Sequence, residues 1–291
     1  MTRKSLKIVH ISDWHGKRYI LPHADLYVVT GDMNYNFPFI TTQKPNGVRE
    51  RKLANVHLLG RPRANDYNDV NRFSHDWEDR FVCREMVPET EKACQDEFIS
   101  LQPSLRECFG NRDAPVVMVR GNHDFTDLSQ MVGGNVWEVS KDSSRSVDIE
   151  GWKIGGFRGI KYIAGEWADE LHDGQIQDQV DDLPKDLDIL ITHMPSGGIF
   201  DIYTTGMGTI RASGSPYLRE WIREKAQVSG PLTAHCFGHV HESINIGEPP
   251  WTGTVFSNAA TGANTMNIYN DKLTEYLCLT ELRGFNETRV I

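Results

Sequence analysis

Seven side chains that could ligate metal ions occur in short groups along the chain. They are Asp13, His15, Asp32, Asn122, His193, His239 and His241. All of them offer oxygen or nitrogen and none offers sulfur, a donor set that suits Mn²⁺, Fe²⁺ or Zn²⁺. This set is too large for one ion that keeps an open position, and it is about right for two ions that share one ligand. The pattern therefore predicts a centre with two metal ions.

Two divalent ions held about 3.5 to 4 Å apart perform well-defined chemistry on phosphoesters. They bind phosphoryl oxygens, lower the pKa of a bridging water, and stabilise the attacking and leaving oxygens. A leaving alkoxide also needs a proton, and His123 lies beside the predicted ligand Asn122. We therefore predict His123 as a general acid or as an electrostatic stabiliser of the transition state. Asp124, which follows, is predicted to act with it by orienting it or the neighbouring backbone.

Each group of candidate ligands follows an apolar run that is typical of a strand buried on both faces. The runs cover residues 7–12, 26–30, 116–119, 187–192 and 232–237. Because ligands in α/β folds bind beyond the carboxyl ends of parallel strands, the side chains that follow these strands are expected to meet in one crevice. In Asp13-x-His15 and His239-x-His241, alternate residues of an extended segment can face the same way.

Taken one at a time, the same residues have simpler explanations. Aspartates such as Asp13 and Asp32 often cap helices, and a single histidine is more often a core residue than a ligand. Capping does not predict the ordered series Asp, Asp, Asn, His and His-x-His, so the joint pattern favours metal binding. His10 and His235 match no motif, and His235, inside an apolar run, is predicted to be packed in the core.

Residues 36–115 interrupt this regular pattern and are predicted to form an insertion within a single domain spanning residues 1–291. The first part, residues 37–68, is rich in Pro, Gly and Asn and is predicted to be a long loop. Its basic positions Arg49, Arg51, Lys52, Arg61 and Arg63 are either a substrate-facing lip or, as we favour, a solvated loop without interleaved aromatics.

The second part of the insertion is predicted to be helical. Apolar residues recur there at spacings of three and four, which indicates an amphipathic helix. They are Cys94, Phe98, Leu101, Leu105 and Cys108. Beyond the insertion, a Gly-rich loop is predicted over residues 195–214, and Pro216 is predicted to open a helix over residues 217–227.

Composition and charge limit the class of protein. With 39% apolar and 24% charged residues, the chain has the composition of an ordinary globular protein. The net charge of -9 disfavours unaided binding to a long phosphate backbone. Five cysteines without a C-x-x-C pair indicate reduced thiols. No apolar stretch has the length of a secretory signal or a membrane span, so a cytoplasmic protein without a membrane partner is expected.

The motifs, in their order along the chain, resemble the five signature motifs of the calcineurin-like metallophosphoesterases. They are Asp13-x-His15, Gly31-Asp32, Gly121-Asn122-His123-Asp124, His193 and Gly238-His239-x-His241. The resemblance implies a four-layer αββα sandwich, in which two facing mixed β-sheets lie between helices. It also implies that His123 contacts the scissile phosphate.

The resemblance further implies how the ligands are shared between two divalent ions, Mn²⁺, Fe²⁺ or Zn²⁺, with Mn²⁺ expected to support activity. One ion would be held by Asp13, His15, Asp32 and His241. The other would be held by Asp32, Asn122, His193 and His239. Asp32 would bridge the two ions.

Further residues look like those of the MPPED-like phosphodiesterases, which are related to the class III cyclic-nucleotide phosphodiesterases. They are Thr192-His193-Met194-Pro195, Gly198, Asp201, Gly214-Ser215, Leu218 and Gly238-His239-Val240-His241-Glu242. The chain departs from that branch at Ser196, where a second proline is common, and in its longer insertion.

This resemblance implies hydrolysis of a nucleotide-type phosphodiester, such as a cyclic nucleotide, by attack of a metal-bridging hydroxide. The open alternatives are a nuclease acting on DNA or RNA ends, a phosphomonoesterase, and a scaffold without catalysis.

Overall fold

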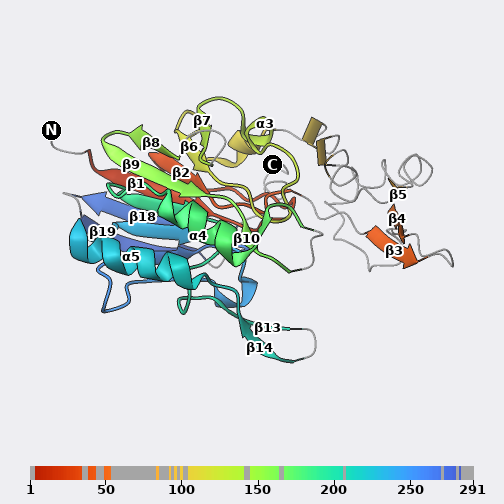
Figure 1. The fold of residues 1–291 in the computed structure, drawn as a ribbon. Coiled ribbons are helices and arrows are strands. Elements are labelled where there is room, and N and C mark those ends of the chain that lie inside the picture. The colour runs from red at the N-terminus through yellow and green to blue at the C-terminus, as the bar shows by residue number, and fades with distance from the viewer. Residues whose placement is uncertain are drawn as a thin grey trace.

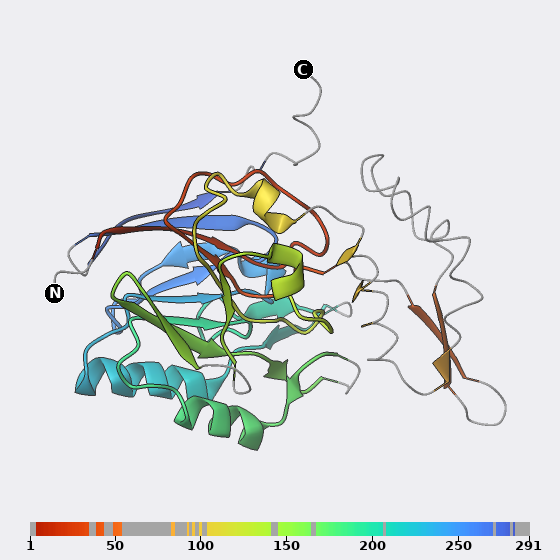
Figure 2. The same ribbon diagram turned by 90° about the horizontal axis from the view of Figure 1, so that it is seen from above.

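Two six-stranded sheets lie face to face in the computed structural model (Figure 1, Figure 2). The structure describes residues 4–34, 39–43, 49–53, 83–84, 92, 95–96, 99–100, 104–140, 145–163, 167–205, 208–269, 272–279 and 282. No helix in these ranges is long and apolar enough to cross a membrane.

The first sheet has the strand order β19-β18-β1-β2-β6-β7. Its strands are β19 (Lys272–Leu279), β18 (Ala263–Tyr269), β1 (Leu6–Ile11), β2 (Leu26–Val29), β6 (Val116–Met118) and β7 (Val136–Glu138). Strands β1, β2, β6 and β7 run parallel to one another. β18 pairs antiparallel with β1, and β19 pairs antiparallel with β18. The central β2 and β6 are buried along their whole length, as their unbroken apolar sequences predict.

The second sheet has the strand order β16-β17-β15-β12-β9-β8. Its strands are β16 (Asn245–Gly247), β17 (Val255–Asn258), β15 (Ala234–Phe237), β12 (Ile189–Thr192), β9 (Trp152–Phe157) and β8 (Ser146–Ile149). The middle four strands are parallel, and the two edge strands are antiparallel. Both sheets are therefore mixed.

Three hydrophobic clusters separate the layers. The cluster between the sheets joins residues such as Val28 of β2 to residues such as Ile191 of β12. Helices α4 (Asp173–Asp181) and α5 (Pro216–Val228) cover the outer face of the second sheet. The outer face of the first sheet packs against η2 (Leu105–Cys108) and the short α3 (Ser129–Val132). The predicted sandwich of two mixed sheets is confirmed.

Part of the insertion forms strands where the sequence predicted a long loop, so that prediction is wrong over these residues. Two strands fall within the predicted loop, β3 (Phe39–Gln43) and β4 (Arg49–Leu53), and they pair antiparallel. Beyond the predicted loop, β5 (Cys83–Arg84) pairs antiparallel with β4 and completes a small sheet. Ladder hydrogen bonds between β3 and β4 outweigh the loop-like composition around them, and the run Ile40-Thr41-Thr42 favours extended backbone.

Other predictions for the insertion fall partly outside the described residues. Of the predicted helical stripe, Leu105 and Cys108 are buried in η2, while Cys94, Phe98 and Leu101 lie outside. The side chains of the basic positions lie outside as well. The division into one domain with an insertion over residues 36–115 stays a prediction.

A hairpin occupies much of the predicted Gly-rich loop over residues 195–214. Its strands β13 (Ile202–Thr204) and β14 (Ile210–Ala212) pair antiparallel and project from the body of the molecule (Figure 1). Asp201 holds its base, because the carboxylate accepts a hydrogen bond from the Gly198 N–H (2.8 Å) and its carbonyl accepts one from Ser213 N–H (2.9 Å). The prediction of a loop missed this pairing.

Two histidines are buried within the sheets, His10 in β1 and His235 in β15. His10 contacts hydroxyl groups through both ring nitrogens, and His235 contacts the Thr192 hydroxyl at 2.9 Å through Nε2. The Nδ1 of His235 has no hydrogen-bond partner among the described residues. Burial lowers the pKa of both imidazoles to about 3. Both are therefore neutral core residues.

Acid is predicted to destabilise the fold through these two histidines. An unfolded histidine takes up a proton near a pH of about 6.5, whereas His10 and His235 stay neutral in the folded chain down to a pH of about 3. Above about pH 6.5 both histidines are neutral in the folded and the unfolded chain, so they do not lower the free energy of unfolding. Below that pH, the contribution of each falls by about 1.4 kcal/mol per pH unit.

His235→Phe should remove one such contribution and flatten the pH slope of the unfolding free energy by about that amount. The measurement is urea unfolding of the metal-free chain between about pH 4 and about pH 6. His23→Phe, at an exposed histidine, is the control. A slope that is unchanged in His235→Phe would contradict a neutral buried His235.

Candidate metal centre

The seven predicted ligands come together where the carboxyl ends of the two sheets meet. From turns after β1, β2 and β6, the first sheet contributes Asp13, His15, Asp32 and Asn122. From turns after β12 and β15, the second sheet contributes His193, His239 and His241. The contacts described next link all of them into one centre.

One group of ligands consists of Asp13, His15 and His241, whose ligating atoms all lie within 4.8 Å of one another. The Nε2 atom of His241 lies 3.1 Å from Oδ1 of Asp13 and 3.3 Å from Nε2 of His15. The backbone N–H of His239 donates to Oδ2 of Asp13 at 2.9 Å and thereby orients the carboxylate. Three atoms that can bind a cation thus converge on one point.

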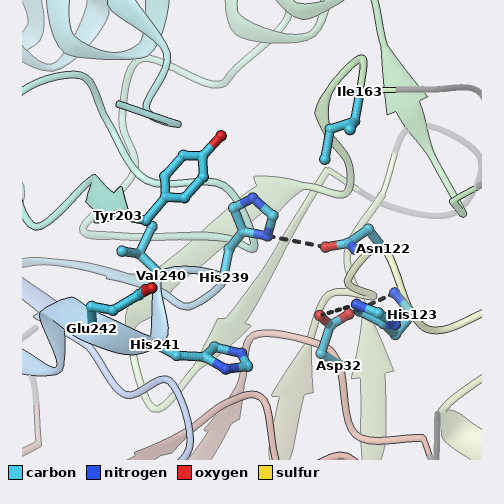
Figure 3. A pocket seen from close by; sticks show the side chains of 9 residues that line it. All are labelled: Asp32, Asn122, His123, Ile163, Tyr203, His239, Val240, His241 and Glu242. Atoms are coloured by element: carbon cyan, nitrogen blue, oxygen red, sulfur yellow. Dashed lines mark hydrogen bonds and ion pairs between the residues drawn. The ribbon is translucent and has the colours of Figure 1, made fainter. Parts of the chain in front are cut away.

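The second group consists of Asp32, Asn122, His193 and His239. The Nε2 atom of His193 lies 3.2 Å from Oδ2 of Asp32 and 3.1 Å from Oδ1 of Asn122. The Nδ1 atom of His239 lies 3.0 Å from the same Asn122 oxygen (Figure 3). Ligand atoms of Asp13, Asp32 and His193 also lie within 4.8 Å of one another, so the two groups adjoin.

The position of the proton on the His193 ring indicates that the second group of residues suits a cation. Its Nδ1 atom lies 2.6 Å from the Thr30 carbonyl oxygen, which can only accept, so Nδ1 carries the proton. In the neutral ring, Nε2 then presents a lone pair to the oxygens of Asp32 and Asn122. Such lone pairs repel one another unless a proton or a metal ion lies between them. The Thr30 carbonyl thus orients His193 as a metal ligand.

The charges of the centre also favour a cation. Burial alone would raise the pKa of Asp32, but His193 and His123 outweigh it and hold that pKa well below its usual range. Burial would lower the pKa of His193, but Asp32 and Asp13 raise it to about 10. Burial lowers the pKa of His239 to about 4, which keeps its ring neutral. Binding of metal ions would displace the proton of His193, because ligating imidazoles are neutral.

Four of the predicted ligands have left-handed backbone conformations. Their φ angles are 56° at Asp13, 46° at His15, 54° at Asp32 and 71° at His239. Aspartate and histidine tolerate this region better than most residues, but the conformation still carries strain. Strain of this kind is concentrated at functional sites, where the surrounding structure holds it in place.

Asp124 lies behind the centre and not in the pocket. Its buried carboxylate accepts hydrogen bonds from the backbone N–H groups of Asp32 (2.6 Å), Gly121 (2.9 Å), Asn34 (3.0 Å) and Met33 (3.1 Å). Burial and the nearby Asp32 carboxylate raise the pKa of Asp124 to about 7, and the donated amides oppose that shift. The geometry gives Asp124 the part of holding the backbone that carries the ligands.

Two glycines allow the turns after β2 and β6 to touch. Gly31 has a φ of 94°, and a Cβ atom there would lie 2.2 Å from the Gly121 nitrogen. A Cβ atom at Gly121 would lie 2.1 Å from Oδ1 of Asp32. A side chain at Gly31 would therefore push the two turns apart, and one at Gly121 would displace Asp32.

His123 lines the pocket, but its imidazole lies farther from the candidate ligands than these ligands lie from one another. Its backbone N–H donates to Oδ1 of Asp32 at 2.7 Å, while its Nε2 lies 3.9 Å from Oδ2. The imidazole packs between the rings of His15 and Trp167, with centroid separations of 5.0 Å and 4.4 Å. Burial, opposed by Asp32, lowers its pKa.

Several residues at the centre were not predicted from the sequence. Gln95 is buried and holds the loop of His123, because its Nε2 donates to the His123 carbonyl (2.5 Å) and its Oε1 accepts from the Phe125 N–H (2.9 Å). Trp167 comes from a loop and Tyr203 from the short strand β13, and neither segment has a periodicity that would mark these residues in the sequence. Glu242 also lines the pocket; the sequence marked it as the last residue of a motif but predicted no role for it.

The geometry predicts that the two groups of ligands bind metal separately. The chain with native ligands is expected to bind two Mn²⁺ ions per molecule. His241→Ala should retain one ion, because the second group stays intact, whereas Asp32→Asn should weaken both sites by removing the charge between them. Metal content after gel filtration, with His23→Ala as the control, checks this. Two tightly bound ions in both variants would contradict the assignment.

Among the comparisons with known proteins, a family model identifies the family of the chain. The family model of the calcineurin-like phosphoesterases matches residues 6–243, a range that holds every predicted ligand. No curated protein sequence matches the chain. A hypothetical protein from Thermus thermophilus shares 8% sequence identity at a TM-score of 0.42, over 95% of this chain and 99% of that chain. The family match covers most of the sequence, and the chain belongs to the calcineurin-like phosphoesterase family.

Proposed function

We propose that the chain is a phosphodiesterase that depends on two divalent metal ions and hydrolyses a nucleotide-type phosphodiester, such as a cyclic nucleotide. Family membership already implies a metal-dependent hydrolase of phosphoric esters. The observation that carries the finer proposal is the placement of His123. It faces the pocket beside the metal ligands and remains available to a leaving group.

The residues of the chain divide the work of this reaction. Two bound metal ions would polarise the phosphoryl group and lower the pKa of water. The candidate ligands would hold the ions that bind the phosphate, and Asp124 fixes the backbone that carries Asp32. His123 would donate a proton or an N–H hydrogen bond to the ester oxygen that leaves. Trp167 and His15 restrict the orientation of the His123 ring.

The pocket favours a diester over a monoester. A phosphodiester carries one negative charge, whereas a monoester carries up to two near neutral pH. The described residues that line the pocket include no Lys or Arg, and Glu242 adds a carboxylate. That lining suits the less charged ester.

The same lining weighs against the nuclease, which needs a basic track for the nucleic-acid backbone. The scaffold alternative is disfavoured because every ligand position is filled and His123 is present.

Placement in the MPPED-like branch is part of this proposal. The motif residues Gly198, Asp201 and Gly214 form the base of the β13–β14 hairpin, and Ser215 caps α5 by accepting from the Leu218 N–H (3.2 Å). These residues support a structure next to the pocket, which is consistent with a shared substrate class. Mn²⁺ as the active ion and a cytoplasmic location are proposed with it, on the donor set and on reduced thiols.

Hydrolysis of bis-p-nitrophenyl phosphate and p-nitrophenyl phosphate with Mn²⁺ tests the proposal. The chain is expected to prefer the diester. His123→Ala should lower kcat for the diester by about 100-fold to 10,000-fold without loss of metal, whereas His23→Ala should have no effect. If His123 donates a proton, the loss should be larger for cyclic AMP, whose leaving group is an alkoxide. No metal-dependent cleavage of either ester would overturn the proposal in favour of the scaffold.

A further inference from the structure

One wall of the pocket contains side chains that contribute nothing to metal binding. The pocket has a volume of about 260 Å³, and beyond the metal ligands and His123 it is lined by Ile163, Tyr203, Val240 and Glu242. These four residues are called the outer wall of the pocket. Within it, Tyr203 and Ile163 lie on either side of His239, and Glu242 lies below Tyr203 beside His241 (Figure 3). A pocket of this volume can hold one ring system but is too small for a length of nucleic acid.

The β13–β14 hairpin directs Tyr203 into the pocket. Successive residues of a strand face opposite ways, so Ile202 and Thr204 face away from the pocket, together with Ile210, which pairs with Thr204. Ile202 and Ile210 are indeed 54% and 70% exposed, whereas Tyr203 is half-buried. The hairpin thus has one face toward the pocket and one toward solvent.

The hairpin is tied to the segment that carries a metal ligand. The Ser243 hydroxyl donates to the Ile202 carbonyl oxygen at 3.0 Å. Ser243 belongs to η3 (His241–Ser243), which also contains Glu242. The hydrogen bond thus links the strand of Tyr203 to the helical turn of Glu242 and His241. A group bound by Tyr203 and Glu242 is therefore positioned relative to the metal centre.

The chemistry of this wall selects its ligand. Tyr203 offers an aromatic face and Ile163 an aliphatic one, which together suit a flat, uncharged ring. The Glu242 carboxylate can only accept hydrogen bonds, so it suits hydroxyl or amino donors and repels a second phosphate. Arg211 pairs with Tyr203 across the hairpin, but it is not among the described residues that line the pocket.

We propose that this wall binds the nucleoside half of the substrate, with ribose hydroxyls donating to Glu242 and the base stacked on Tyr203. Glu242 follows the candidate ligand His241 in η3, whereas Tyr203 belongs to the hairpin, an arrangement that suits ribose next to the phosphate and the base beyond it. The inference rests on the proposed function for the reaction itself, and it adds the residues that determine specificity. It also predicts that substrates with further phosphates next to the ribose are rejected.

Binding of AMP and of ribose 5-phosphate to the Mn²⁺-loaded chain tests the inference, because the two ligands differ only in the base. Calorimetry is expected to show tighter binding of AMP. Tyr203→Ala should weaken AMP binding by about 5-fold to 100-fold, the usual effect of losing a base–aromatic stack, and leave ribose 5-phosphate within about 2-fold. Tyr203→Phe should retain the affinity for AMP. Ile210→Ala, on the outer face of the same hairpin, is the matched control.

Glu242→Gln separates the ribose contact from the phosphate contact. It should weaken AMP and ribose 5-phosphate alike and leave the binding of inorganic phosphate unchanged.

Equal affinity of the native chain for AMP and ribose 5-phosphate would overturn the inference, and so would an equal loss of both in Tyr203→Ala or no binding of either. Selective AMP binding without hydrolysis of any diester would leave the nucleoside site standing and refute the proposed function instead.

Discussion

The buried carboxylate of Asp124 is the interaction on which the centre depends. It accepts hydrogen bonds from backbone N–H groups in the turn after β2 and from the Gly121 N–H after β6. It thereby holds together the ends of two neighbouring strands that are far apart in the sequence. The amide donors offset part of the cost of burying this carboxylate, although its pKa is still raised to about 7. Because the turn after β2 has a left-handed residue at Asp32, these bonds also hold a conformation that the residue alone would not favour.

A second connection joins the two sheets. His193 extends from the second sheet and donates to the carbonyl oxygen of Thr30 in the first, which fixes the ring while its other nitrogen faces Asp32. The contact makes the position of one ligand depend on the packing of both sheets. The core between the sheets, which includes Val28 and Ile191, therefore sets the spacing of the centre as well as the stability of the fold.

The sequence predicted the two sheets and the convergence of the candidate ligands, because both leave local signals: apolar runs, followed at once by Asp, Asn or His. It did not predict the β13–β14 hairpin, since loop-like composition hides a pairing that depends on the neighbouring η3. Tyr203 and Trp167 arrive from such segments and follow no period. The sequence left open whether Asp124 orients His123 or the neighbouring backbone. In the structure its carboxylate accepts hydrogen bonds from backbone N–H groups, and no spacing rule reports that direction.

Gln95 couples its own segment of the chain to the loop at the pocket. Both ends of its amide bind the loop between His123 and Phe125, so the free energy that orders this part of the insertion is shared with the loop at the pocket. Coupling of this kind is reciprocal: a ligand that separates Gln95 from this loop and a ligand that binds at His123 change each other's affinity by the same factor. Gln95 is thus energetically part of the pocket.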